Sequence, residues 1–341
     1  MQSFINGVKH LRPLFLLVIL LVCCVPITIA MEPDRTVQPA NSPAIESSIR
    51  QDLNNGHAND AIDLLQRDLA RNSANATDHI LLCRVYFQEE QWTQAEQECS
   101  RAVELDPNSS RYHQWLGRAY GGAAAHSPLT KAYSLAKKVH AEFETAVRLD
   151  PHNESALSDL GEYLVDVPRL LGGGTAHAEE IAQKLQPLNA ARYHALEAKI
   201  DAKKSDDSAA EQQWKLAIQT SSSPAEEWMG LAQFYAERKN YPAMQQAIQS
   251  GIAADPDHGP ALVQGATLLI EKHQDPAQAE QMLRRYLASS HQTEDAPAFQ
   301  VQVQLGNLLA ANGDHAEATK EFAAAHSLAG QYEAAQQAPR G

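Results

Sequence analysis

The sequence predicts an all-α protein, built as an elongated array of helical hairpins. Ala, Leu, Gln and Glu recur at spacings of three and four residues, as helices with one buried face require. Runs in which Val, Ile or Thr alternate with polar residues, which are typical of strands, are scarce. The dipeptide Asp-Pro recurs at 106–107, 150–151 and 255–256. Each of these three copies marks the end of a helical stretch, because proline cannot continue a helix.

The composition limits the classes of partner. The chain has 341 residues, a formal net charge of −14, 44% apolar residues and 6% aromatic residues. This is typical of an ordered protein with few large side chains for its core. A strongly acidic surface repels nucleic acid and anionic membranes, so no nucleic-acid partner is expected.

Residues 1–30 have the pattern of a secretory signal peptide. Lys9 and Arg12 precede the apolar run Leu14–Val25, and Thr28 and Ala30 supply small residues at the −3 and −1 positions of a cleavage site. The mature protein is therefore expected to be exported, either periplasmic or secreted. If the apolar run continues to Ile29, an uncleaved membrane anchor is the alternative.

Residues 31–41 contain two prolines and no apolar period, and they are expected to form a linker. From residue 42 onward one arrangement recurs. In the stretch 76–109 it places Leu82 and Tyr86 on one face of a first helix, and Ala95 and Ala102 on one face of a second.

This arrangement resembles the tetratricopeptide repeat, a 34-residue helix–turn–helix unit with the pattern W-x2-L-G-x2-Y in its first helix. In 225–258 the matching residues are Trp228, Leu231 and Tyr235. The expected units are 42–75, 76–109, 110–153, 154–190, 191–224, 225–258, 259–295 and 299–332, with a flexible tail at 333–341. The resemblance implies a right-handed α-solenoid of about seven to eight units with a concave inner surface.

Three consecutive glycines, Gly172–Gly174, stand out in the unit 154–190. Glycines inside a helix cost about 1 kcal/mol each, so they are expected to form a turn between two helices, with Thr175 as the N-cap of the second. A phosphate-binding loop is the alternative, but neither a preceding apolar strand nor a following Gly-Lys-Ser/Thr supports it.

The unit 110–153 is ten residues longer than the 34-residue pattern. One interpretation is a loop followed by a longer second helix, since insertions in repeats are well tolerated. The other is a projecting element that contacts a partner through Lys131, Lys137 and Lys138.

The resemblance also implies a binding face, because related repeats use set positions of the first helix to line their groove. Residues at these positions are Arg84, Arg111, Gln114, Arg118 and Glu162. Arginine forks bind carboxylates in a bidentate manner, so an acidic peptide segment or a chain terminus is the expected ligand. Pairing of Arg118 with Glu162, or a merely solvated charged face, is the alternative.

The sequence offers no catalytic or metal-binding motif. The 14 histidines form no H-E-x-x-H pattern, and His113, His140 and His177 are interpreted as surface residues. Cys83 and Cys99 fall on facing sides of the two helices of one unit. They either form a disulfide in an oxidising compartment or remain buried free thiols.

The leading functional hypothesis is a non-catalytic scaffold that binds an extended peptide or protein segment in the concave groove, within the cell envelope, without a cofactor. The alternatives are a small-molecule-binding, glycan-binding or enzymatic protein on the same solenoid, and a membrane-anchored assembly subunit that keeps its leader.

Overall fold

The protein is all-α over the residues that the structure describes. The computed structural model describes residues 43–257 and 259–336, which form the α-helices α2–α18 and one short 3-10 helix, η1. This part contains no β-strand, only an isolated bridge between Thr293 and Ala296. The predicted fold class is therefore confirmed. The predicted signal peptide (1–30), the linker (31–41) and residues 337–341 of the predicted tail lie outside the described residues.

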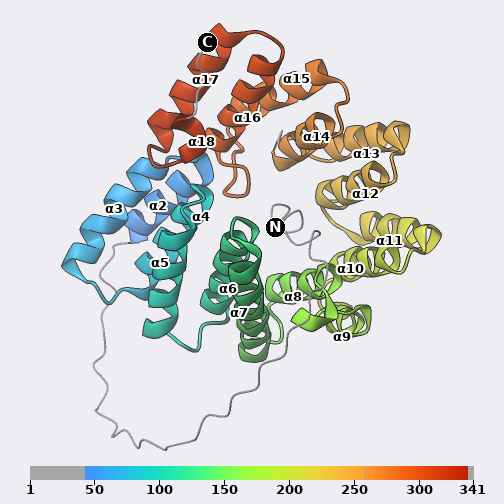
Figure 1. Ribbon diagram of the computed structural model, residues 1–341, viewed down its shortest axis with the longest axis horizontal. Helices are drawn as coiled ribbons and strands as arrows, with labels where there is room; N and C mark the ends of the chain where they lie inside the picture. Colours follow the sequence, from blue (N-terminus) through green and yellow to red (C-terminus); the bar gives the residue numbers. More distant parts are fainter. Residues whose placement is uncertain (1–42, 258, 337–341) are drawn as a thin grey trace, which may run out of the picture.

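The helices follow one another as eight antiparallel pairs (Figure 1). These are α2 (Pro43–Asn55) and α3 (Ala58–Arg71), α4 (Ala76–Gln88) and α5 (Trp92–Leu105), α6 (Ser110–Ala125) and α7 (Leu129–Leu149), α8 (Glu154–Asp166) and α9 (Thr175–Leu185), α10 (Ala190–Lys203) and α11 (Asp207–Thr220), α12 (Ala225–Glu237) and α13 (Tyr241–Ala253), α14 (Pro260–Glu271) and α15 (Pro276–Leu287), and α16 (Ala298–Ala311) and α17 (His315–Leu328). The short η1 (Arg169–Leu171) precedes α9, and α18 (Glu333–Gln336) ends the described chain.

The same local signals begin and end helices in successive pairs. Asn75 and Ser109 cap α4 and α6, each accepting a backbone N–H bond from the first turn. Between the two helices of a pair, residues such as Glu90 and Lys239 adopt a positive φ of 58° and 59°. The next N–H then bonds back into the helix, as from Gln91 to the carbonyl of Tyr86 at 2.8 Å. These turns make each pair a tight hairpin.

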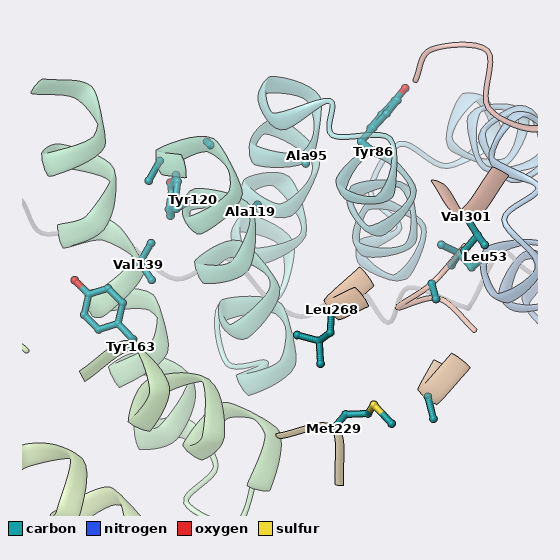
Figure 2. Packing of buried hydrophobic residues seen from close by; sticks show 14 of the residues in the cluster. Leu53, Tyr86, Ala95, Ala119, Tyr120, Val139, Tyr163, Met229, Leu268 and Val301 are labelled. Carbon is teal, nitrogen blue, oxygen red and sulfur yellow. The ribbon is translucent and has the colours of Figure 1, made fainter. Parts of the chain in front are cut away.

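The hairpins share one continuous apolar core. The first helices of neighbouring pairs contact each other from α2 to α14, and in Figure 1 they lie toward the centre of the molecule. A single cluster of buried apolar side chains runs from Ile49 in α2 to Ala335 in α18. Figure 2 shows Leu53 of α2 close to Val301 of α16, although the two residues belong to opposite ends of the chain.

The array closes on itself into a ring (Figure 1). Helix α17 contacts α3, and the Asn59 side chain donates to the carbonyl of Ser327 at 3.0 Å and accepts from the N–H of Gly330 at 2.9 Å. Gly56, with φ +72°, lies so close to α16 that an added Cβ would be 2.6 Å from the backbone nitrogen of Ala298. We call this junction of the first and last repeats the closure seam.

A second set of contacts extends the seam toward the centre of the ring. The Gln88 side chain of α4 donates to the carbonyl of Leu53 at 3.0 Å. The side chain of Gln300 in α16 donates to the carbonyl of Gln88 at 2.6 Å. A closed ring of helices therefore surrounds the inner face. The sequence predicted a concave groove and gave no indication that the array closes.

The long unit adds helix instead of loop. Helix α6 has 16 residues and α7 has 21, whereas α4 and α5 have 13 and 14. Only His126–Pro128 connect α6 to α7. The expected longer second helix is thus confirmed and the expected loop is wrong, because the extra residues lengthen both helices.

The structure corrects two details near helix ends. Gly172–Gly174 do form the turn before α9, but Gly174 is the N-cap and Thr175 is the first helical residue, with no side-chain cap. Residues 333–336, expected within a flexible tail, form α18, in which Ala335 is buried.

Candidate functional site: an arginine cluster on the inner face

Two of the three arginines that the sequence assigned to the groove lie over one tryptophan. Arg84 of α4 and Arg118 of α6 place their guanidinium carbons 5.2 and 4.9 Å from the ring centroid of Trp115, within the range of cation–π attraction. Arg111 lies one turn before Trp115 on α6. We call Arg84, Arg111 and Arg118 the inner arginine cluster.

Arg84 holds a carboxylate from the far end of the chain. Its Nε donates to Glu294 Oε1 at 2.7 Å, and its Nη2 donates to Glu294 Oε2. The side chains of Arg84 and Glu294 are only 10% and 16% exposed, so water weakens this bidentate pair little. The Gln88 amide adds a bond to the backbone carbonyl of Glu294 at 2.9 Å.

Glu294 stands at the tip of the connector 288–297, the longest link between helices in the described part. The N–H of Ala296 bonds to the carbonyl of Thr293 at 3.1 Å, which makes Glu294 and Asp295 the two central residues of a β-turn. The buried Tyr286 hydroxyl fixes this turn, accepting from the N–H of Thr293 at 2.9 Å and donating to the carbonyl of Ala296 at 2.6 Å. We call Thr293–Ala296 the acidic turn.

Arg118 is also bound to a carboxylate. Its Nε donates to Asp159 Oδ2 of α8 at 2.7 Å, and Gln114 donates to the same oxygen at 2.7 Å. Burial lowers the pKa of Arg118, but the carboxylates of Asp159, Asp295 and Glu294 outweigh it and raise the pKa. Arg118 therefore stays charged, and its main role here is to join α6 to α8.

Glu162 does not bond to Arg118, contrary to the alternative drawn from the sequence. Its carboxylate binds the Lys199 ammonium of α10 at 2.5 Å, and the aspartate one turn earlier, Asp159, takes the arginine instead. The inner face thus carries a series of cross-repeat ion pairs from α4 to α10.

Arg111 differs from the other two arginines. Its side chain is exposed, and no carboxylate of the described residues lies within ion-pair distance of it. Partial desolvation, with repulsion from Arg84 and Arg50, lowers its pKa. Among the three arginines of the cluster, Arg111 is the cation best placed to bind an anion from outside the described structure.

The contact with the acidic turn leaves polar atoms unsatisfied. Arg84 Nη1, Gln88 Oε1 and Thr293 Oγ1 are buried and have no hydrogen-bond partner among the described residues. Each such group costs roughly 1–3 kcal/mol. The acidic turn therefore occupies the cluster without using all of its hydrogen-bonding capacity.

The histidines are only partly surface residues. His113, expected at the surface, is buried and joins the Glu142 carboxylate at 2.6 Å with Nδ1 and the carbonyl of Pro107 at 3.0 Å with Nε2. His79 repeats this arrangement with Glu98 at 2.6 Å in the preceding repeat. His140 is half-buried and stacks on Tyr163, whereas His177 is exposed.

Within the described residues, no group of three or more His, Cys, Asp or Glu side chains is arranged to hold a metal ion. No described helix is both long enough and apolar enough to cross a membrane. Shallow surface depressions occur along α15 and along α5, and none of their lining residues belongs to the arginine cluster.

Cys83 and Cys99 are joined by a disulfide between α4 and α5, with a Cα–Cα distance of 5.2 Å. Both residues are fully buried. The bond fixes the hairpin that carries Arg84 and Gln88, and so it supports the inner face at the closure seam.

Sequence reasoning missed Trp115, Gln88, Asp159 and Glu294 as parts of this site. Trp115 could have been found, because it lies between Arg111 and Arg118 on one helix. The acidic pair Glu294-Asp295 in a connector before Pro297 was also visible. What joins that pair to Arg84 is ring closure, which no local pattern shows.

Comparison with known proteins identifies the repeats. Residues 53–119, which include Arg84, Arg111, Trp115 and Arg118, match the family model for the tetratricopeptide repeat. The chain contains tetratricopeptide repeats. Proteins built from this repeat are in general non-catalytic scaffolds that bind proteins or peptides. No curated protein sequence matches the chain.

One of the solved structures that align with the chain supports the fold. Yeast Tom70 aligns with a TM-score of 0.53 at 15% identity, covering 90% of this chain and 66% of that one. The Cut9–Hcn1 hetero-tetramer of APC/C aligns with a TM-score of 0.46 at 17% identity, covering 73% of this repeat protein and 47% of that chain. A thermophilic tetratricopeptide protein of Thermus thermophilus aligns at 0.46 and 15% identity, covering 55% and 98%. The chain spans about half of the Cut9–Hcn1 chain, and at these identities the likeness concerns the fold alone.

Proposed function

We propose that this repeat protein is a non-catalytic scaffold that binds an acidic segment of a partner protein on the inner face of its ring, at the inner arginine cluster. The observation that carries the proposal is Arg111, an exposed cation with no described carboxylate within ion-pair distance. It lies beside Trp115 and Arg84 in a chain of net charge −14. Such a cation attracts the carboxylates of an acidic segment.

The chemistry of the neighbouring residues supports the same class of ligand. Arg84 and Arg118 each hold a carboxylate in a bidentate or paired geometry, and Gln88 holds a backbone carbonyl. Side-chain charge and backbone bonds together are what recognition of a polypeptide requires. The cluster is thus built to bind an acidic stretch of chain.

We also propose that the protein acts outside the cytoplasm, in the periplasm or as a secreted protein. Two observations support this location. The first 30 residues have a signal-peptide pattern, and a buried disulfide persists most readily in an oxidising compartment. N-terminal sequencing of the protein from its host would test the proposal, since a mature chain that begins at Met31 excludes a retained anchor.

Site-specific photo-crosslinking in the native host tests the binding function. A photoreactive amino acid replaces Asn108, an exposed residue three positions before Arg111, or, as the control, Lys184, which is exposed on α9 at the outside of the ring. We expect a reproducible protein adduct from position 108 only, attached through an acidic stretch of the partner, and its loss when Arg111→Gln is added. No adduct at 108, or the same adducts from both positions, would contradict the proposal.

A further inference from the structure

The inner arginine cluster already contains an acidic segment, which belongs to the chain itself. We propose that the acidic turn Thr293–Ala296 is a built-in ligand that occupies the cluster until an acidic turn of a partner protein displaces it. This inference rests on the proposed function, because it names the chemistry of the partner and the regulation of the same site.

The contacts of the acidic turn are those of a bound peptide. Arg84 binds the Glu294 carboxylate through two nitrogens, and Gln88 binds the carbonyl of the same residue. The second acidic residue, Asp295, is exposed and acts electrostatically on Arg118. The cluster therefore binds both the carboxylate and the backbone carbonyl of Glu294, and Asp295 adds a second negative charge that acts on Arg118.

The length of the connector exceeds what the fold needs. Other successive repeats are joined by four to six residues, as at 106–109 and 254–259. The link between α15 and α16 has ten, although these two helices are in contact like other neighbours. The additional residues carry the acidic turn across to α4. Extra loop residues cost little closure entropy, so the turn is free to serve as a ligand.

The fit of the built-in ligand is incomplete. Arg84 Nη1, Gln88 Oε1 and Thr293 Oγ1 are buried without partners in the described structure, and Arg111 has no described carboxylate within reach. A partner turn that satisfies Arg84 Nη1 and Gln88 Oε1 and adds a carboxylate at Arg111 binds more favourably than the chain's own turn, whose Thr293 Oγ1 is hydrated once it is displaced. The built-in ligand competes well because its attachment to the chain gives it a high effective concentration at the cluster. The partner can displace it only by making more favourable contacts.

Displacement also reaches the closure seam. Gln88 bonds at once to Glu294, to Leu53 of α2 and, through its carbonyl, to Gln300 of α16. A partner that removes the acidic turn therefore takes away one of the links between the two ends of the ring. Binding at the inner face is coupled to the seam through this glutamine.

A peptide with the chain's own sequence tests the proposal. The probe is a fluorescent synthetic peptide of residues 288–299, and the matched control peptide carries Gln in place of Glu294. We measure anisotropy with the wild-type protein, with Glu294→Gln and with the double variant Arg84→Gln/Glu294→Gln. A competing intramolecular ligand reduces apparent affinity by the fraction of sites that are open. We expect Glu294→Gln to bind the probe roughly tenfold more tightly than the wild type, and the double variant and the control peptide to show no such gain.

Hydrogen exchange gives a second measurement that does not depend on the variant folding. Wild-type protein labelled uniformly with 15N, which separates its connector from the unlabelled probe of the same sequence, is expected at saturating probe to exchange faster at residues 289–296 and more slowly at the N-terminal part of α6. A folded Glu294→Gln that gains no affinity for the probe, or a wild-type connector whose exchange the probe leaves unchanged, would overturn the proposal. If a partner still crosslinks at position 108 in either case, the proposed function survives and only the built-in ligand is lost.

Discussion

The carboxylate of Glu89, in the turn after α4, accepts the backbone N–H of Gln331 at 3.2 Å, across 242 residues of sequence. Glu89 is 1% exposed, and its second oxygen has no partner among the described residues. Burial raises the pKa of this carboxyl to about 7. The closure seam therefore contains an acid that changes charge near neutral pH.

Stability should fall as the pH rises through the pKa of Glu89. A carboxyl with a raised folded-state pKa favours folding below its ordinary pKa of 4.5, and this contribution is lost as the pH passes about 7. The difference amounts to roughly 3 kcal/mol above that range. We expect the free energy of unfolding, measured with urea at pH 5 and pH 8, to fall in the wild type and to change less in Glu89→Gln.

Other titratable groups act in the same direction, so the pH dependence must be compared between the wild type and Glu89→Gln. Burial also raises the pKa of Glu90, and Tyr332 faces it from the last turn. The bond to Glu142 raises the pKa of His113, while at His79 the bonds to Glu98 and Ser73 outweigh burial and raise the pKa. These histidines also lose their stabilising charge as the pH rises. Equal pH dependence in wild type and Glu89→Gln would show that Glu89 is not the titrating group of the seam.

Asn59→Ala should weaken the closure seam selectively. The substitution removes the bonds to Ser327 and Gly330, at a cost of about 1–2 kcal/mol for the pair. We expect faster hydrogen exchange in α3 and in residues 327–332, with the middle repeats unchanged. Asn54→Ala, at an exposed position of α2, is the control, and the same exchange pattern in both variants would count against the assigned role of Asn59.

Reduction of the disulfide should destabilise the second repeat. Cys83 and Cys99 are 16 residues apart, and a loop of this size contributes about 3 kcal/mol when it is closed. We expect a reducing agent to lower the midpoint of thermal unfolding in the wild type and to have no effect on the double variant Cys83→Ala/Cys99→Ala. A midpoint that does not respond to reduction in the wild type, with both thiols shown to be free, would contradict this.

Arg118 and Arg111 should respond differently to charge reversal. Arg118→Glu places a carboxylate against the buried Asp159, and loss of such a pair costs about 3–5 kcal/mol. Arg111→Glu removes an exposed cation and should change stability by no more than about 0.5 kcal/mol. Urea unfolding of both variants checks this. Equal losses would mean that Arg111 carries a structural contact, and a binding defect could then not be assigned to it.

The local architecture followed from the sequence because it depends on neighbouring residues. Small and large apolar residues at helical spacing, with turns marked by Asp-Pro, define each hairpin and its stacking on the next. Ring closure depends on the rotation accumulated over eight repeats, to which the longer α6 and α7 contribute. No short stretch of sequence contains that sum, so Asn59 and Gly330 gave no sign of their contact.

The sequence predicted the arginines of the candidate site but not the carboxylates that bind them. Arg84, Arg111 and Arg118 recur at set positions of the first helices, which places them on one face. Asp159 binds Arg118 from one turn before the position that the family pattern indicates for Glu162. Glu294 reaches Arg84 from 210 residues away. Ion pairs between repeats depend on how far the side chains reach and on which repeats ring closure brings together. The sequence pattern of a single repeat specifies neither.

Chemical crosslinking across the closure seam tests the ring most directly. A short thiol-specific crosslinker is applied to the full chain carrying Asp60→Cys and Gln331→Cys, exposed neighbours of the bonded pair Asn59 and Gly330, with the native disulfide intact, and to a control with Lys184→Cys and Gln331→Cys on opposite sides of the ring. We predict that mass spectrometry will find the peptides containing positions 60 and 331 joined within one monomer, and no corresponding link from position 184. Failure to link 60 with 331 in a folded monomer, or links only between two copies, would contradict a closed ring.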